Sequence, residues 1–360
     1  MENRVSPIAV ICLSTGSGGM ELDAVKLADL LSRRSKTVLI CKQNSFVEQL
    51  VNKGNYSFDC QSIVFINKDF SFSMLMKTRS LLERYLVKNV IYFGASELKM
   101  LYFAFAGKDL NVVVRHGTTK SRAKRDWFHR LIYSCVNYHV AISKHLLNNV
   151  RQIVPTGRNV RFKIIYPSFA FAEYRRSNGK TSEKIHIIHV GRVARGKGHI
   201  DAIHACRVLY DKRQDFELLF LGDNKDRGYM DEIKRLLKDL PYADKVKFAG
   251  YVDDVGKYLV KADIFLYPSY GEGFGNVFVE AMAFGLSVVS YKNTTFPEFG
   301  EMGFRFRMAE NKNIYSLSAM LLQAAECLAS DRMELMSNAK LSAELFNKER
   351  ELSDWCSLLV

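Results

Sequence analysis

Residues 272–280 read Glu-Gly-Phe-Gly-Asn-Val-Phe-Val-Glu and place two carboxylates eight positions apart. Glu272 precedes a Gly-x-Gly turn, and Glu280 lies inside the helix that this turn is expected to open. Apolar runs at Ile264–Tyr267 and Leu286–Tyr291 flank the stretch, each with the length of a buried strand. This order puts both acids at the carboxyl edge of an open α/β sheet, where small anionic ligands bind beside helix N-termini.

A second turn of this kind follows the apolar run Ile185–Val190 and reads Gly191-Arg192-Val193-Ala194-Arg195-Gly196-Lys197-Gly198. A guanidinium contacts two phosphate oxygens with its planar fork, whereas an ammonium supplies a compact positive charge. Arg192 and Lys197 could therefore stabilise a departing diphosphate without a metal, while Arg195 could equally face water. Together with the acidic pair, the turn predicts an enzyme that binds a nucleotide diphosphate-sugar.

The bulk properties describe a two-domain globular protein. A chain of 360 residues is too long for one comfortable core, and 48% apolar residues is an ordinary content for a globular protein. No apolar run approaches the roughly 18–20 residues that span a bilayer, and Ile8–Leu13 is expected to be a first strand rather than a signal peptide. The seven cysteines are scattered without Cys-x-x-Cys spacing, which disfavours disulfides or a zinc site and favours a reducing cytoplasm.

Strand-like runs alternate with helical patterns along the N-terminal half. A helical apolar spacing at Met20, Ala24, Leu27 and Leu31 separates the first two runs. Alternation of this kind predicts a parallel, doubly wound sheet. The expected strands are Ile8–Leu13, Thr37–Cys41, Val90–Phe93, Val112–Arg115, His139–Ile142 and Lys163–Tyr166.

The C-terminal half repeats the scheme after a polar segment, Ser168–Ser182, that is typical of an interdomain linker. The sequence thus predicts an α/β protein of two Rossmann-like domains that face each other across a cleft. The expected strands are Ile185–Val190, Glu217–Leu221, Val246–Phe248, Ile264–Tyr267 and Leu286–Ser290, and the expected helices are Ile200–Tyr210, Met230–Leu240, Ile314–Ser330, Arg332–Phe346 and an amphipathic tail at Arg350–Leu359.

The positive charge of the chain is unevenly distributed. Residues 1–167 contain 25 Lys and Arg against 11 Asp and Glu, a net charge of +14, whereas residues 168–360 contain 27 of each and are neutral. An excess confined to one half favours an anionic partner there, such as a phosphorylated lipid surface, an acidic glycan or a nucleic acid. A generally basic protein without a specific partner is the alternative.

Several candidate residues lie in the basic half. His116, at the end of a strand, could hydrogen-bond a sugar or phosphate, or could simply cap the strand. Gly16-Ser17-Gly18-Gly19 joins the first strand to the first helix and is either a ligand loop or a tight turn. The segment after His116 mixes cations with aromatics, which suits an anionic lipid interface, single-stranded nucleic acid or a solvated helix face. Its candidate acceptor or membrane contacts are Lys120, Arg122, Lys124, Arg125 and Trp127.

Taken together, these motifs resemble those of retaining glycosyltransferases of the GT-B fold, family 4. The likeness covers most of the chain, and its two C-terminal motifs are specific in combination, whereas the two N-terminal ones are not. The overall pattern is similar to enzymes that build lipopolysaccharide core or other bacterial surface glycans. The motifs are Gly18-Gly19-x-Glu21, His116, Gly191-Arg192 with Lys197-Gly198, and Glu272-x7-Glu280.

The resemblance implies a role for each candidate. Arg192 and Lys197 would hold the donor diphosphate, Glu272 the donor sugar and Glu280 the ribose. His116 would touch the donor sugar near the reacting carbon, which makes His116, Arg192, Lys197 and Glu272 the implied catalytic set. The other implied donor contacts are Gly18, Gly19, Gly191, Phe274 and Gly275, together with the backbone at Tyr251 and Val252, which would read the base, most often uracil.

The resemblance also implies the domain plan: an acceptor-binding domain at 1–167, a nucleotide-sugar-binding domain at 168–345, and a helix at 346–360 that returns to the first domain and gives Trp355 its partner. Two departures leave the donor sugar open. Ser287 stands where family members often have Pro, and Asn293–Glu298 replaces a Gly-Gly-x-Pro-Glu loop. The chain has no Asp-x-Asp, consistent with chemistry that needs no metal and no cofactor beyond the nucleotide-sugar co-substrate.

We therefore expect a retaining, metal-independent hexosyltransferase that uses a UDP-sugar and a lipid-linked or lipopolysaccharide-type acceptor. It would bind the anionic inner face of the cytoplasmic membrane peripherally and would have no nucleic-acid partner. A UDP-sugar 2-epimerase or hydrolase on the same fold would bind the donor without an acceptor. A nucleic-acid-binding protein would explain the charge but not the acidic and basic motifs, and a catalytically idle lipid-surface scaffold is a further alternative.

Overall fold

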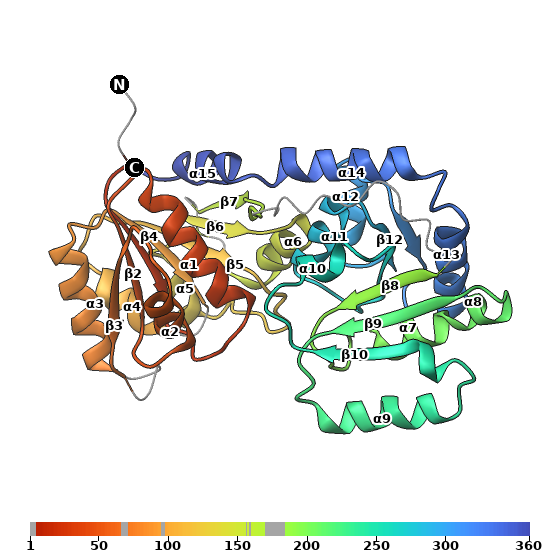
Figure 1. The fold of residues 1–360 in the computed structure, drawn as a ribbon. Coiled ribbons are helices and arrows are strands. Elements are labelled where there is room, and N and C mark those ends of the chain that lie inside the picture. Colours follow the sequence, from red (N-terminus) through yellow and green to blue (C-terminus); the bar gives the residue numbers. More distant parts are fainter. Residues whose placement is uncertain (1–4, 66–70, 95–97, 156, 158–159, 170–183) are drawn as a thin grey trace. The chain divides into compact units, whose positions relative to one another are not determined.

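The computed structural model describes residues 5–65, 71–94, 98–155, 157, 160–169 and 184–360. The chain divides into two compact units, one formed by Met1–Ser168 with Lys348–Val360 and the other by Phe169–Asn347. Most of the linker expected at 168–182 lies outside the described residues. Each unit is an α/β layer structure with one parallel sheet, as the alternating pattern predicted (Figure 1).

The first unit holds a seven-stranded parallel sheet in the order β3-β2-β1-β4-β5-β6-β7. Six of its strands were expected, five of them from apolar runs and β7 from the segment before Pro167. The seventh, β3, was missed because it is a half-exposed edge strand of sequence Asp-Cys-Gln-Ser-Ile, which carries no apolar run. The strands are β1 (Ile8–Cys12), β2 (Thr37–Lys42), β3 (Asp59–Ile63), β4 (Asn89–Phe93), β5 (Asn111–His116), β6 (Tyr138–Ala141) and β7 (Arg161–Ile164).

Helices cover both faces of this sheet. One apolar cluster joins the sheet to α1, α2 and α15, and the other joins it mainly to α3, α4 and α5. The C-terminal helix α15 buries Trp355, which is 1% exposed, in the first of these clusters. The helices are α1 (Gly19–Ser32), α2 (Phe46–Lys53), α3 (Phe72–Arg84), α4 (Leu98–Phe105), α5 (Trp127–Tyr133), α6 (Lys144–Ile153) and α15 (Lys348–Cys356).

The second unit holds a six-stranded parallel sheet in the order β10-β9-β8-β11-β12-β13. Its order reverses between β8 and β11, which are hydrogen-bonded neighbours although two strands separate them in sequence. In open α/β sheets such a switch point is where ligands bind. The strands are β8 (Ile185–Val190), β9 (Phe216–Leu221), β10 (Val246–Gly250), β11 (Ile264–Tyr267), β12 (Ser287–Tyr291) and β13 (Arg307–Ala309).

The helices of the second unit differ from expectation in one division and in some short additional elements. The single helix expected at Ile200–Tyr210 is divided at the buried residue Cys206, whose ψ of −11° turns the backbone away from regular helix. The short elements α10, α12 and β13 were not anticipated. The helices are α7 (His199–Ala205), α8 (Arg207–Asp211), α9 (Arg227–Lys238), α10 (Gly256–Leu259), α11 (Asn276–Ala283), α12 (Phe296–Glu301), α13 (Ile314–Glu326) and α14 (Arg332–Leu345), with a 3-10 turn at Ala243–Lys245.

In the part of the chain that the structure describes, none of the helices combines the length and the apolar character that crossing a bilayer requires.

Candidate functional site

Two loops meet at the switch point of the second sheet. The first, Gly191–Gly198, joins the carboxyl end of β8 to α7, and the second, Pro268–Gly275, joins the carboxyl end of β11 to α11. The two motifs that the sequence singled out therefore lie at the carboxyl ends of neighbouring strands, as predicted for the acidic pair.

Gly198 explains how closely the two loops approach. Its φ of +75° lies in the left-handed region, and a Cβ atom at this position would stand 2.0 Å from the carbonyl oxygen of Pro268. Only glycine permits this contact, because any side chain would collide with backbone. A hydrogen bond of 2.8 Å from the Tyr270 N–H to the Gly196 carbonyl closes the same junction.

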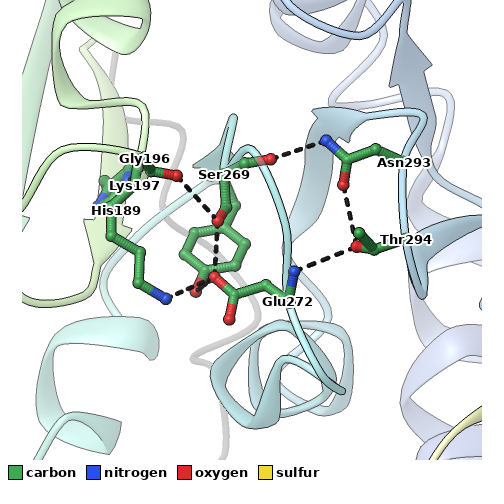
Figure 2. A network of polar contacts seen from close by, with 8 residues as sticks. His189, Gly196, Lys197, Ser269, Glu272, Asn293 and Thr294 are labelled. Atoms are coloured by element: carbon green, nitrogen blue, oxygen red, sulfur yellow. Dashed lines mark hydrogen bonds and ion pairs between the residues drawn. The ribbon is translucent and has the colours of Figure 1, made fainter. Parts of the chain in front are cut away.

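The approach brings Lys197 and Glu272 together (Figure 2). The Lys197 Nζ atom lies 2.6 Å from Glu272 Oε1, and the hydroxyls of Tyr267 and Ser269 each donate to that oxygen at 2.7 Å. The side chains of the pair are 24% and 13% exposed. No hydrogen bond to Glu272 Oε2 is formed within the described part of the chain, so three donors hold one carboxylate oxygen and leave the other available.

Burial and the neighbouring Glu272 carboxylate raise the pKa of Tyr267 well above its usual value. The phenol therefore stays protonated and acts as a hydrogen-bond donor. Tyr267 and Ser269 were not among the predicted site residues. The signal for them is position, since they occupy the last residue of a buried strand and the second residue after it, at the edge where ligands bind.

A polar clamp supports Glu272 from the loop after β12. The Glu272 N–H donates to Thr294 Oγ1 at 3.1 Å, and the Thr294 hydroxyl donates to Asn293 Oδ1 at 3.0 Å. The Asn293 amide in turn donates to the Ser269 carbonyl at 2.9 Å. Asn293 and Thr294 begin the segment that departs from the Gly-Gly-x-Pro-Glu pattern, so the departure concerns residues that contact the acidic loop.

A buried histidine lies under the basic loop. His189, on β8, places its Nε2 atom 2.9 Å from the Lys197 carbonyl oxygen, and its ring lies 4.4 Å from that of His199. Burial lowers the pKa of His189 to about 4 and that of His199 to about 2. Both imidazoles are therefore neutral at pH 7, and the Nε2–H of His189 donates to the loop carbonyl that precedes Gly198.

The two arginines of the basic loop differ. Arg192 is exposed, and its guanidinium makes no hydrogen bond or ion pair with any residue that the structure describes. Arg195 instead pairs with Glu232 on α9 and lies over the ring of Tyr229, 5.2 Å from its centroid. The structure thus leaves Arg192 free for a ligand and engages Arg195 at the surface, and it does not bring Arg192 into contact with Lys197 or Glu272.

The remaining candidates of the second unit lie on three of its elements or next to them. Glu280 is the fifth residue of α11 and is half-buried, and Tyr251 is 75% exposed just after β10, next to the half-buried Val252. The Phe274 ring is buried in an aromatic cluster with Phe299 and Phe346, so only its backbone is presentable to a ligand. Gly275 caps α11 with a φ of +87°, and Gly191 follows β8.

In the first unit, Gly18 and Gly19 are exposed at the start of α1. Gly18 has an extended backbone with φ of −165°, which other residues also adopt. Behind this loop the hydroxyl of Ser14 donates to the buried carboxylate of Glu21. An exposed glycine loop at the carboxyl end of β1 suits a ligand, but nothing tests that role, and it stays a prediction.

His116 is buried, with 2% of its surface exposed. Its Nε2 atom lies 2.9 Å from Nδ1 of His139 on β6, and burial together with nearby cations lowers its pKa well below the usual value. The structure therefore has the imidazole paired inside the first unit rather than presented to solvent. Contact with a sugar stays a prediction.

The basic–aromatic segment lies on the surface of the first unit. Trp127 opens α5 and is 77% exposed, and Arg122 and Arg125 are also exposed. Lys120 and Lys124 are half-buried, and their backbone N–H groups donate to the side chain of Asn149 and to the carbonyl of Ile153. The segment is therefore tied to α6 by its backbone while several of its cations and its tryptophan face solvent.

Within the described ranges, no group of three or more His, Cys, Asp or Glu side chains is arranged to hold a metal ion.

Comparison with known proteins places this architecture among GT-B glycosyltransferases. The crystal structure of Anabaena Alr3699/HepE in complex with UDP superposes with a TM-score of 0.82 at 16% identity, covering 97% of this chain and 98% of that one. A curated relative, an uncharacterized glycosyltransferase of Haemophilus influenzae, is 24% identical over 374 residues, 98% of this chain and 99% of its own length. The chain therefore has the GT-B fold.

The second unit carries the family assignment. The family Glycosyl transferases group 1 matches residues 170–341, and this chain therefore contains a glycosyltransferase group 1 domain. A second relative, the amylovoran biosynthesis glycosyltransferase AmsK of Erwinia amylovora, is 32% identical over 166 residues. That match spans 43% of this chain and 40% of the AmsK chain.

Proposed function

We propose that this protein is a retaining, metal-independent glycosyltransferase that moves a hexose-type sugar from a UDP-sugar to a lipid-linked or lipopolysaccharide-type glycan. The observation that supports this most directly is the contact of Lys197 with Glu272 at the switch point of the second sheet. A cation suited to a diphosphate and a carboxylate suited to sugar hydroxyls stand side by side there. The diphosphate of a nucleotide-sugar and the sugar attached to it require this combination.

The relatives support the donor and the kind of product. Anabaena HepE has been crystallised with UDP, and AmsK is named for the biosynthesis of amylovoran. In our proposal the uracil lies by Tyr251, the ribose by Glu280, and the donor sugar against the free oxygen of Glu272.

The chemistry we propose depends on charge. As the glycosidic bond breaks, negative charge develops on the leaving diphosphate, and Arg192 and Lys197 stabilise it from fixed positions. Preorganised charges of this kind commonly supply the largest single part of an enzyme's acceleration. The acceptor hydroxyl attacks the anomeric carbon from the face that the diphosphate leaves and gives its proton to the departing phosphate oxygen, so the configuration at that carbon is retained.

Replacing Lys197 tests the proposal. Turnover of the best UDP- or GDP-sugar, selected by saturation-transfer NMR, should fall roughly a hundredfold in Lys197→Ala, the loss typical of removing one such group. Lys234→Ala is the matched control, because Lys234 is an exposed lysine of α9 in the same unit. A Lys197→Ala enzyme that is folded and as active as the wild type would refute the assignment. Sugar release or conversion without any acceptor would instead indicate a hydrolase or epimerase.

We also propose that the first unit docks on an anionic membrane surface. Trp127 and Leu131 lie one helical turn apart on α5 and are 77% and 44% exposed, and Phe128 beside them is 36% exposed. Exposed Arg122 and Arg125 precede them. Aromatic and aliphatic side chains beside cations are typical of helices that bind the interface of anionic bilayers.

Vesicle flotation tests the membrane proposal. The protein should float with vesicles that contain phosphatidylglycerol and stay behind with pure phosphatidylcholine, and Trp127→Ser should reduce the bound fraction. Tyr315→Ser is the control, because Tyr315 is an aromatic residue that is 90% exposed on α13 of the other unit. Equal flotation with both lipids would contradict an electrostatic dock.

A further inference from the structure

Thr294 has a backbone conformation that threonine rarely adopts. Its φ is +43°, in the left-handed region, and it lies in the short loop between β12 and α12. For a β-branched residue this region is strained, whereas glycine would enter it freely. Strain kept at one position of a candidate site calls for a compensating role of the side chain.

The Thr294 hydroxyl stands in the middle of a directed chain of hydrogen bonds (Figure 2). Its hydrogen is committed to Asn293 Oδ1 at 3.0 Å, which turns an oxygen lone pair toward the Glu272 N–H at 3.1 Å. The Asn293 amide then reaches the Ser269 carbonyl at 2.9 Å and is also anchored to Asn311 at 2.8 Å. Both ends of the loop from Ser269 to Glu272 are thus tied to one side-chain pair.

The methyl group of Thr294 lies beside Gly271, the residue before Glu272. A Cβ atom on Gly271 would lie 3.3 Å from Thr294 Cγ2, closer than ordinary van der Waals contact. A side chain on the residue before Glu272 would therefore crowd the Thr294 methyl group, which lies beside this backbone position. Valine would keep this packing and lose the hydroxyl, whereas serine would keep the hydroxyl and lose the methyl group.

We propose that Thr294 is a positioning residue for Glu272. Its hydroxyl accepts a hydrogen bond from the Glu272 N–H and so fixes the backbone position from which the Glu272 side chain extends. Oε1 then reaches Lys197, Tyr267 and Ser269, while Oε2 is left for a donor-sugar hydroxyl. This inference rests on the sugar-binding role proposed for Glu272. In this inference the strained Thr294 determines how accurately the Glu272 carboxylate is positioned for the sugar.

Three substitutions of Thr294 separate the effect of the hydroxyl from the effect of the backbone strain. In Thr294→Val the kcat/KM for the donor should fall about tenfold, the usual order for losing a hydrogen bond in a preorganised site, while the affinity for UDP without a sugar does not fall. Thr294→Ser should keep kcat/KM within about twofold of the wild type, because its hydroxyl restores the same bond. Thr294→Gly should unfold at a higher temperature and yet lose activity as Thr294→Val does.

The higher unfolding temperature and the lower activity expected of Thr294→Gly separate positioning from stability. If Thr294 had a merely structural role, activity would rise and fall with the unfolding temperature. Wild-type kinetics in Thr294→Val, or equal losses in the valine and serine variants, would overturn the inference. If the wild type neither binds UDP nor turns over any donor, the proposed function fails instead. Amide hydrogen exchange of Glu272 in the ligand-free protein then decides the inference: exchange should accelerate in the valine variant and stay slow in the serine variant, and equal protection in both overturns it.

Discussion

Replacing Glu272 by glutamine should strengthen the binding of UDP while it weakens turnover of the UDP-sugar. In the ligand-free protein the Lys197 ammonium already has an anionic partner 2.6 Å away, so a diphosphate must compete with Glu272 for that charge. Glutamine keeps an oxygen for the hydroxyls of Tyr267 and Ser269 and removes the negative charge. The lysine becomes available to UDP, while the sugar loses a charged acceptor for its hydroxyls.

The burial of the pair sets the size of the effect. Exposed ion pairs contribute about 0.2–1 kcal/mol, and pairs withdrawn from water contribute more because screening is weaker. The side chains of the Lys197–Glu272 pair are 24% and 13% exposed, so the pair lies between an exposed pair and one fully withdrawn from water. We expect about 1–2 kcal/mol, which corresponds to a roughly fivefold to thirtyfold lower Kd for UDP.

Isothermal titration calorimetry with UDP measures this directly, and a double-mutant cycle identifies the cause. In a Lys197→Ala background the glutamine substitution should leave the Kd for UDP unchanged, because no ammonium remains to be released. Glu232→Gln is the matched control, since Glu232 pairs with Arg195 at the surface of the same unit. An unchanged or higher Kd for UDP in Glu272→Gln would refute the idea that Glu272 restrains Lys197.

The loop junction and the buried histidines give the remaining predictions. Gly198→Ala should abolish UDP binding in calorimetry, because the new Cβ would stand 2.0 Å from the Pro268 oxygen. In the control Gly196→Ala the new Cβ has open space, and backbone strain should lower the free energy of unfolding by only about 1 kcal/mol. Equal effects of the two substitutions on UDP binding would argue against the close approach of the loops. His199 has its pKa lowered to about 2 by burial, so below pH 6.5 the unfolded chain binds a proton that the folded chain does not, and stability falls as the pH falls. In urea unfolding, His199→Phe should therefore gain about 2 kcal/mol relative to the wild type between pH 8 and pH 5, and an unchanged difference would contradict this.

Particular residues show how far sequence patterns reach into this site. Lys197 and Glu272 were recognisable because each follows a buried strand and stands beside glycines at a helix start. Tyr267, Ser269 and His189 were not, because a tyrosine, serine or histidine at the end of an apolar run is indistinguishable from a core residue without its neighbours. For His116 the position at the end of β5 predicted a ligand contact, which stays a prediction, whereas its burial against His139 could not be seen in the sequence.

The order of apolar runs, turns and glycines in this chain is local information, and it was sufficient for the two parallel α/β sheets, for most of their strands and for the two loops that carry charge. The contacts between those loops are not local. That Lys197 meets Glu272, and that Thr294 holds the latter's backbone, depends on which strands become neighbours and on a glycine that lets one loop touch the other. Such contacts join residues far apart in sequence, and only the folded chain selects them from the many pairings that the same side chains allow.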